Sequence, residues 1–310
     1  MRPSNMIILN LSRSQEEGGM PKVKIFGIGE YGKRVAKSTV NELSVFKGSV
    51  ENELLYRIKT ENPHHPTDTD LAFFIGELEH YDSIIEANWI IDKVAKSEAN
   101  GDIPSFLDKA NKPLTIGIIA FDSDSLIKEL SIENKRKLFQ FETIFDTVLR
   151  ISKNDLMVNL QSSKTKKQSD FLCSMAQKTI VTVINSFFLH AGIIGCDFAD
   201  IKHIFTGHNT ARLGFYKASD LEKAIHLAGN MIPSDLNKHK TGAVVIVITT
   251  KENKLELGEF QKIAELIQDN MHSQDADIIL QYVCPKEHDD EIEISIIAIS
   301  GNQSSVESNL

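Results

Sequence analysis

Val23-Lys-Ile-Phe-Gly27-Ile-Gly29-Glu-Tyr-Gly32 is the clearest structural signal in this sequence. A short run rich in β-branched residues ends in Gly27, two further glycines complete a Gly-x-Gly-x-x-Gly spacing, and a helical pattern follows over 33–43. A strand, a glycine turn and a helix in this order are typical of nucleotide-binding sheets, because the backbone N–H groups of the helix N-terminus can face phosphate. Glycine turns also connect strands to helices without any ligand, so the motif alone leaves nucleotide binding open.

Alternating strands and helices continue outward from this turn. Continuous apolar runs indicate buried parallel strands, and runs with helical spacing separate them. The expected strands are 23–26, 54–58, 71–75, 114–121 and 143–151, and the expected helices are 33–43, 84–95 and 125–139. The alternation predicts a Rossmann-like parallel α/β sheet with the glycine turn at its switch-point side.

The second half of the chain has a different order of expected helices and strands. A polar joint over 161–170 precedes one long, mostly apolar helix over 171–191. After it we expect helices at 197–205, 219–230 and 257–271, and strands at 212–216, 243–249, 277–283 and 292–299. This pattern predicts a second, smaller α/β domain with a mixed sheet.

The domain organisation follows from these patterns. We expect a flexible tail over 1–19, a nucleotide-binding-type domain over 20–165, a central helix over 166–192, a second domain over 193–300 and a short polar tail over 301–310. Met20 stands directly before the first clear strand and is an alternative start to Met1. A polar stretch over 100–112 is expected to be an irregular insertion.

Composition narrows the classes of function. The 310 residues carry a net charge of −9 with 41% hydrophobic residues, which disfavours non-specific nucleic-acid binding. No apolar run is long enough to insert into a membrane. Three widely spaced cysteines fit neither a disulfide framework nor a zinc pattern, and the histidines lack companion ligands, so we expect a cytoplasmic protein without a metal centre.

One pair of carboxylates stands out. Asp197 and Asp200 are three residues apart at the start of an expected helix, which puts both on one helix face. They could position a water, or they could simply interact favourably with the helix dipole.

The order of these segments resembles FtsZ of the tubulin superfamily over roughly residues 20–300. Ile194-Gly-Cys-Asp-Phe-Ala-Asp-Ile201 is similar to the acidic loop of that family, and Phe145-Asp-Thr-Val-Leu-Arg-Ile151 followed by Asn154-Asp-Leu156 is similar to one of its strands and loops. Ala211-Arg-Leu-Gly214 continues the resemblance at similar spacing.

The resemblance implies a fold and a mechanism. Two α/β domains would flank the central helix, and GTP with Mg²⁺ would bind the first domain. Subunits would stack head to tail, so that the acidic loop of one completes the GTPase site of the next. The catalytic acids would then be Asp197 and Asp200, and the GTP pocket would be formed by Gly27, Gly29, Gly32, Lys33, Gly76 and Asn154.

Several positions depart from the family pattern. The family's glycine box is replaced by Gly76-Glu-Leu-Glu-His-Tyr-Asp-Ser83, which brings negative charge toward a triphosphate. Glu30 and Tyr31 replace glycines, Lys33 replaces an asparagine, and Met175 stands about where the family has a base-reading aspartate. The acidic loop has Gly195 in place of an asparagine.

We therefore expect an FtsZ-like cytoskeletal or cell-division-related protein that self-assembles or modulates filaments, with weak or absent GTP binding and hydrolysis. Its partner would be itself or an authentic FtsZ in head-to-tail contact. The alternative is a working, polymerising GTPase with unorthodox phosphate loops. Two further hypotheses are a dinucleotide-dependent oxidoreductase, which lacks a recognisable catalytic constellation, and a pure interaction module.

Overall fold

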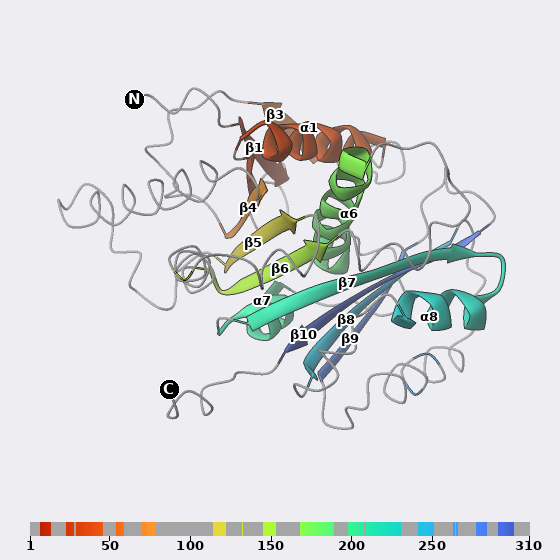
Figure 1. Cartoon of the computed structure of the whole chain (residues 1–310). Coiled ribbons are helices and arrows are strands. Elements are labelled where there is room, and N and C mark those ends of the chain that lie inside the picture. The colour runs from red at the N-terminus through yellow and green to blue at the C-terminus, as the bar shows by residue number, and fades with distance from the viewer. Residues whose placement is uncertain are drawn as a thin grey trace. The chain divides into compact units, whose positions relative to one another are not determined.

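The computed structural model describes residues 7–13, 23–27, 29–45, 54–58, 70–77, 114–121, 132, 145–152, 168–188, 198–207, 209–230, 241–250, 263, 265, 277–283 and 291–300. The chain has a mixed α/β fold and divides into two compact units, Met1–Val181 and Thr182–Leu310 (Figure 1). Each unit contains its own succession of neighbouring strands.

The first unit is built on a sheet with the strand order β3-β1-β2-β4-β5-β6. The bounds are β1 Ile7–Arg13, β2 Val23–Gly27, β3 Leu54–Ile58, β4 Leu71–Glu77, β5 Leu114–Phe121 and β6 Thr147–Ser152. From β2 to β6 each pair of neighbours is parallel, which confirms the parallel sheet predicted from the alternation of strands and helices.

β1 corrects the expectation of a flexible tail over 1–19. Its seven residues lie between β2 and β3 and pair antiparallel with both. The apolar run 6–11 was the local signal, but a run this short becomes a strand only when it finds neighbours, and both neighbours lie further along the chain. The structure therefore contains a strand that the local pattern alone does not reveal.

α1 spans Gly29–Val45 and packs against β2 and β4. Its buried positions include Tyr31, Val35 and Thr39, which recur at helical spacing and form one face of the helix. The helix begins before the expected start at residue 33, so the last two glycines of the turn lie in its first turn rather than in a loop.

An aromatic row crosses the sheet of the first unit. Phe26 on β2 and Phe74 on β4 are register partners, and their rings stack with centroids 4.7 Å apart. The next register partner, on β5, is Gly117, and the ring of Phe145 occupies the space beside it with its centroid 5.1 Å from that of Phe74. The row thus continues although β5 has no side chain at this position.

Asp146 fixes the start of β6 against β5. Its carboxylate Oδ2 accepts hydrogen bonds from the backbone N–H of Thr115 at 2.9 Å and from the Thr115 hydroxyl at 2.8 Å. The backbone N–H of Asp146 donates in return to the carbonyl oxygen of Thr115 at 3.0 Å. Because these bonds precede the parallel ladder, β6 begins at Thr147, later than the expected start at residue 143.

The second unit contains a mixed sheet with the order β7-β10-β8-β9, as the pattern predicted. β10 is antiparallel to both β7 and β8, and β9 is parallel to β8. The bounds are β7 Asn209–Ala218, β8 Thr241–Thr249, β9 Asp277–Val283 and β10 Ile292–Ser300. The central strands β8 and β10 are buried along almost their whole described length. β8 is accordingly a nearly continuous apolar run, whereas β10 also buries Glu293 and Ser295.

α8, Leu221–Asn230, packs against β7 and β10 and closes one face of this sheet. Ala224 and Ile225 of the helix join a buried cluster with residues of all four strands, and this cluster also contains Ile263. Asp220 caps the helix, because its Oδ1 accepts the backbone N–H of Lys223 at 2.8 Å. Ser219 therefore precedes the helix that was expected to begin with it.

The remaining described helices are α6, Gln168–Phe188, and α7, Phe198–Phe205. α6 confirms a long helix close to the expected 171–191, and its residues contribute to both units. The helices expected at 84–95, 125–139 and 257–271 lie outside the described residues except for Ile132, Ile263 and Glu265, which are helical. The insertion 100–112 also lies outside them.

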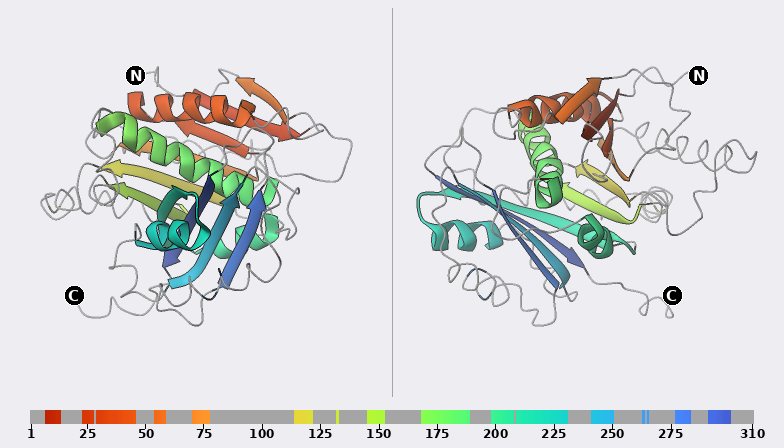
Figure 2. Two further views of the ribbon diagram at one scale, coloured as in Figure 1. Left: turned by 90° about the vertical axis from the view of Figure 1, so that its right-hand side faces the viewer. Right: turned by 180° about the vertical axis from the view of Figure 1, so that it is seen from behind.

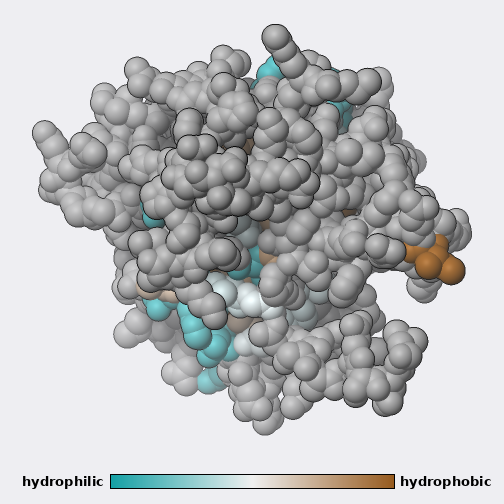
Figure 3. All heavy atoms as spheres, turned by 90° about the vertical axis from the view of Figure 1, so that its left-hand side faces the viewer, coloured by the Kyte–Doolittle hydropathy of each residue, from teal (hydrophilic) through white to brown (hydrophobic). Residues whose placement is uncertain are grey.

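The surface of the described residues carries little hydrophobic area. Ile132 is their exposed large hydrophobic residue, with 89% of its surface accessible. On the face shown in Figure 3 the visible described residues are mostly teal and pale, with one brown group that protrudes. No described helix is long and apolar enough to cross a membrane.

Candidate functional site

Gly27 and Gly32 bring the end of β2 and the start of α1 into direct backbone contact. A Cβ on Gly27 would lie 2.5 Å from the carbonyl oxygen of Gly32 and 2.8 Å from the backbone nitrogen of Lys33. A Cβ on Gly32 would lie 2.9 Å from the carbonyl carbon of Gly27 and would also collide with the carbonyl oxygen of Ile75. These two glycines are therefore required for close strand–helix packing, whether or not a ligand binds.

The same contact gathers part of the predicted pocket at one edge of the sheet. Gly27 is the register partner of Ile75, and Gly76 follows Ile75 on β4. The carboxyl ends of parallel strands are the edge at which open α/β sheets bind ligands. Gly76 was expected to open a phosphate loop, but it lies within β4 and pairs with Ile119, so the loop can begin only beyond Glu77.

The charges at this edge are mixed. Lys33 forms an ion pair with Glu30 one helical turn earlier, with 3.3 Å between Nζ and Oε1. The Lys33 side chain is 17% exposed and that of Glu30 is 90% exposed. A carboxylate in the first turn already interacts favourably with the helix dipole, and it neutralises the one lysine that the sequence offered for phosphate. This pair therefore brings no net positive charge to the edge.

A row of side chains on α1 contacts the first half of α6, and the views of Figure 2 show the two helices side by side. The buried Tyr31 hydroxyl donates to the carbonyl oxygen of Leu172 at 3.0 Å. The Nε of Arg34 donates to the Sγ of Cys173 at 3.1 Å. Ser38 continues the row by donating to Gln177. Tyr31, which replaces a glycine of the resembled loop, is thus used for helix–helix packing.

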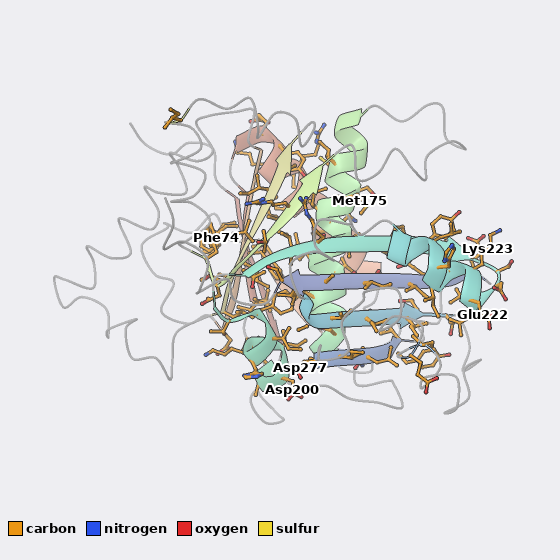
Figure 4. All side chains as sticks on the ribbon, turned by 60° about the horizontal axis from the view of Figure 1, so that its bottom comes forward. Phe74, Met175, Asp200, Glu222, Lys223 and Asp277 are labelled. Carbon is orange, nitrogen blue, oxygen red and sulfur yellow. The ribbon has the colours of Figure 1, made fainter. Side chains whose placement is uncertain are left out.

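Met175 lies on α6 and is 4% exposed (Figure 4). Its thioether has no hydrogen-bond donor and is at best a weak acceptor, so it cannot read a base edge as a carboxylate would. Its backbone carbonyl accepts the hydroxyl of Thr179 at 2.9 Å, which is an ordinary contact inside a helix.

Asp200 lies exposed in the first turn of α7 (Figure 4). The buried face of this helix is formed by Ile201, Ile204 and Phe205, so the carboxylate is left on the accessible side. Asp197 and Asn154, predicted as a catalytic acid and a pocket residue, lie outside the described residues, as does Gly195. The one-face arrangement of the two acids stays a prediction.

Two features of the first unit were not found by sequence reasoning. One is the clamp between Asp146 and Thr115, and the other is the contact of Arg34 with Cys173. Both join residues that are far apart along the chain, and neither has a local spacing that would reveal it. Among the described residues, no group of three or more histidine, cysteine, aspartate or glutamate side chains could hold a metal ion.

The fold and the site define a class: an α/β protein with a glycine turn at the carboxyl edge of a parallel sheet, followed by a second unit with a mixed sheet. No protein-family model matches the chain. Solved structures do match it. An FtsZ dimer from M. jannaschii is similar with a TM-score of 0.59 and 15% identity, over 87% of this chain and 70% of that one.

Two further structures agree with this likeness. A mutant of FtsZ from M. jannaschii has a TM-score of 0.55 at 17% identity, over 76% of this chain and 67% of the other. CetZ from Methanosaeta thermophila has a TM-score of 0.56 at 13% identity, over 91% and 86%. The chain therefore has an FtsZ-like fold, as the sequence resemblance indicated.

Proposed function

We propose that this chain is an FtsZ-like cytoskeletal protein of the cytoplasm that self-assembles or modulates filaments without binding or hydrolysing GTP efficiently. We further propose that two α/β domains flank a central helix over 166–192, with β1 as part of the first domain. The observation that carries the proposal is the coincidence of an FtsZ-like fold with a phosphate edge on which Lys33 is paired with Glu30.

The altered phosphate edge supports a weak pocket. A phosphate cradle needs bare backbone N–H groups and positive charge. Here Gly76, the first residue of the altered stretch, is paired within β4. Glu77 ends that strand, and no glycine box follows it. These described residues do not fit a Mg²⁺–triphosphate.

The residue at the position expected to read the nucleotide base independently supports weak GTP binding. Where the resemblance would require a carboxylate on the central helix, the chain has the buried thioether of Met175. A site that hydrogen-bonds a base loses much of its discrimination when that partner is replaced by an apolar group. Changes at two separate elements, α1 and α6, therefore both weaken GTP binding.

The acidic loop supports an asymmetric role. Asp200 is exposed, and Asp197 completes the motif in sequence. This loop could dock on the nucleotide face of an authentic FtsZ, while the chain's own nucleotide face would not receive a partner in a GTP-dependent way. A head-to-tail contact is heterologous and propagates, so a subunit with one competent face would cap a filament. Nucleotide-independent self-assembly is the other form of this proposal.

Nucleotide content and affinity test the proposal. We expect no GTP or GDP in extracts of the purified protein and no heat of binding with GTP and Mg²⁺ up to millimolar concentration. Co-sedimentation with an authentic FtsZ should then depend on Asp200: Asp200→Asn should weaken it, and Asp277→Asn, an exposed acid of the same unit, should not. Micromolar binding with turnover that Asp200→Asn abolishes would establish the alternative, a working GTPase with unorthodox loops.

A further inference from the structure

β9 lies at the end of the strand order in the second unit, which makes it an edge strand (Figure 1). In the described part of the chain it pairs with β8 alone, and the register does not shift between Asp277 and Val283. Edge strands often carry a lysine, a proline or a bulge that discourages another strand from pairing. The sequence Asp-Ile-Ile-Leu-Gln-Tyr-Val of β9 contains neither lysine nor proline. The strand itself therefore carries no such device against strand addition.

The first half of this edge strand is accessible, whereas its second half is covered. Asp277 is exposed and the three residues after it are half-buried, but Tyr282 is only 1% exposed. The neighbouring central strand β8 is buried from Val244 to Thr249, so the accessibility of 277–280 is a property of the edge position. A partner strand can therefore approach β9 along 277–280.

The register of β9 shows which of its backbone groups point away from β8. Successive residues of a strand direct their N–H and C=O groups to alternate sides. The carbonyl oxygen of Val283 accepts the N–H of Thr250 at 3.0 Å, so the odd-numbered residues of β9 bond to β8. The backbone groups of Ile278 and Leu280 therefore point outward. The side chains of these two residues pack against the buried cluster that includes α8, which holds the edge in place.

We propose that residues 278–280 form a pairing site for the same residues of a second copy of this chain, added antiparallel across a two-fold axis. Strand addition joins outward-facing backbone groups, so Ile278 of each copy pairs with Leu280 of the other. The axis then passes between the two copies of Ile279, which form the closely spaced, non-hydrogen-bonded type of pair. Asp277, the charged residue of β9, lies beyond the paired residues, so no like charges face each other. The strand is therefore complementary to itself, which favours a second copy as the occupant.

This contact goes beyond the head-to-tail assembly of the proposed function and does not depend on it. A two-fold contact is isologous and closes with two copies, whereas a head-to-tail contact propagates. Each hydrogen-bonded antiparallel pair exchanges two bonds, so the two pairs provide about four. A contact of this size is small, and we expect a dimer dissociation constant of about 0.1–1 mM.

Sedimentation equilibrium of the full-length protein without nucleotide tests the register. Because Ile279 faces itself across the axis, Ile279→Lys and Ile279→Glu each oppose two like charges. Each variant alone should therefore raise the dimer dissociation constant at least about tenfold. An equimolar mixture of the two variants should associate more tightly than either alone, since lysine then faces glutamate. Ile279→Val keeps a strand-forming apolar residue and, as the matched control, should dimerise like the wild type.

Hydrogen exchange of the wild-type protein gives a second readout that needs no variant. Exchange of the outward-facing amides of Ile278 and Leu280 should slow as protein concentration rises, while that of Ile279, which faces β8, should not change.

Two results would overturn the proposal. One is a wild-type protein that stays monomeric at millimolar concentration, and the other is a dimer that folded Ile279→Lys and Ile279→Glu leave unchanged. If the charged variants fail to fold, exchange at Ile278 and Leu280 that is independent of concentration overturns it instead. Asp200→Asn should leave this dimer intact, so a failure of the proposed docking through Asp200 is distinguishable from a failure here.

Discussion

The ring of Phe145 lies against Gly117 and takes the place of the side chain that β5 lacks in the aromatic row. A Cβ on Gly117 would be 2.8 Å from Cδ2 of that ring, closer than packed carbon atoms come. Because Asp146 is clamped to Thr115, the residue before it has little freedom to move away. Gly117 is therefore a packing requirement of the first sheet.

Gly117→Ala should lower the free energy of unfolding by about 1–3 kcal/mol, as overpacking of a buried site does. Chemical denaturation measures the loss. Phe145→Leu provides the control, since a smaller, flexible side chain leaves room for the new methyl group. The double variant should lose less stability than the two single losses added together. Additive losses would show that the ring and the glycine are not coupled.

Gly32→Ala should destabilise the first unit, because the new Cβ collides with backbone atoms of Gly27 and Ile75 that cannot rotate away. We expect a loss of about 1–3 kcal/mol in the free energy of unfolding. Lys37→Ala on the exposed side of the same helix should change it by less than about 0.5 kcal/mol. Equal effects of the two changes would contradict a packing role for Gly32.

Thr115→Val removes a hydroxyl that donates to the buried carboxylate of Asp146. Because a charged acceptor then loses one partner in a buried position, the free energy of unfolding should fall by about 1–3 kcal/mol. Thr206→Val is the matched control, since its hydroxyl donates to the carbonyl oxygen of Lys202 at an exposed position and should be nearly neutral. Denaturant titrations of both variants provide the comparison.

Asp220→Ala should destabilise the second unit by about 1 kcal/mol through loss of the helix cap on α8. Asp220→Asn keeps an oxygen that can accept the N–H of Lys223 and should retain most of the stability. Hydrogen exchange of the first amides of α8 locates the effect. An asparagine variant as unstable as the alanine variant would show that the charge, rather than the cap, matters.

Sequence patterns predicted most of the fold because most described strands are buried apolar runs with local periodicity. β3, β5 and β9 have the expected bounds, and the other expected strands agree within a few residues at their ends. β1 was missed, because Ile7–Leu11 becomes a strand only through neighbours far along the chain. The glycine turn was located correctly, but its second and third glycines belong to α1.

The candidate site was predictable only in part. The strand–turn–helix order predicted correctly that Gly27 and Gly32 lie at the carboxyl edge of the sheet, because this motif is formed by residues that are neighbours in sequence. The ion pair between Lys33 and Glu30 was predictable, because the two residues are three apart in the sequence, a spacing that brings side chains together on a helix. The use of Tyr31 and Arg34 to hold α6 depends on tertiary packing, which no local spacing reports. Asp197 and Asn154 stay predictions.

The hydrogen bond from Tyr31 to Leu172 spans 141 residues of chain and has a consequence for biosynthesis. While the protein emerges from the ribosome, α1 is synthesised long before α6, which it contacts in the folded chain. Since synthesis proceeds at about 5–20 residues per second, this interval lasts roughly 7 to 28 seconds. The contacts between α1 and α6 can therefore form only late in synthesis, after β2 and β4, against which α1 also packs, have been made.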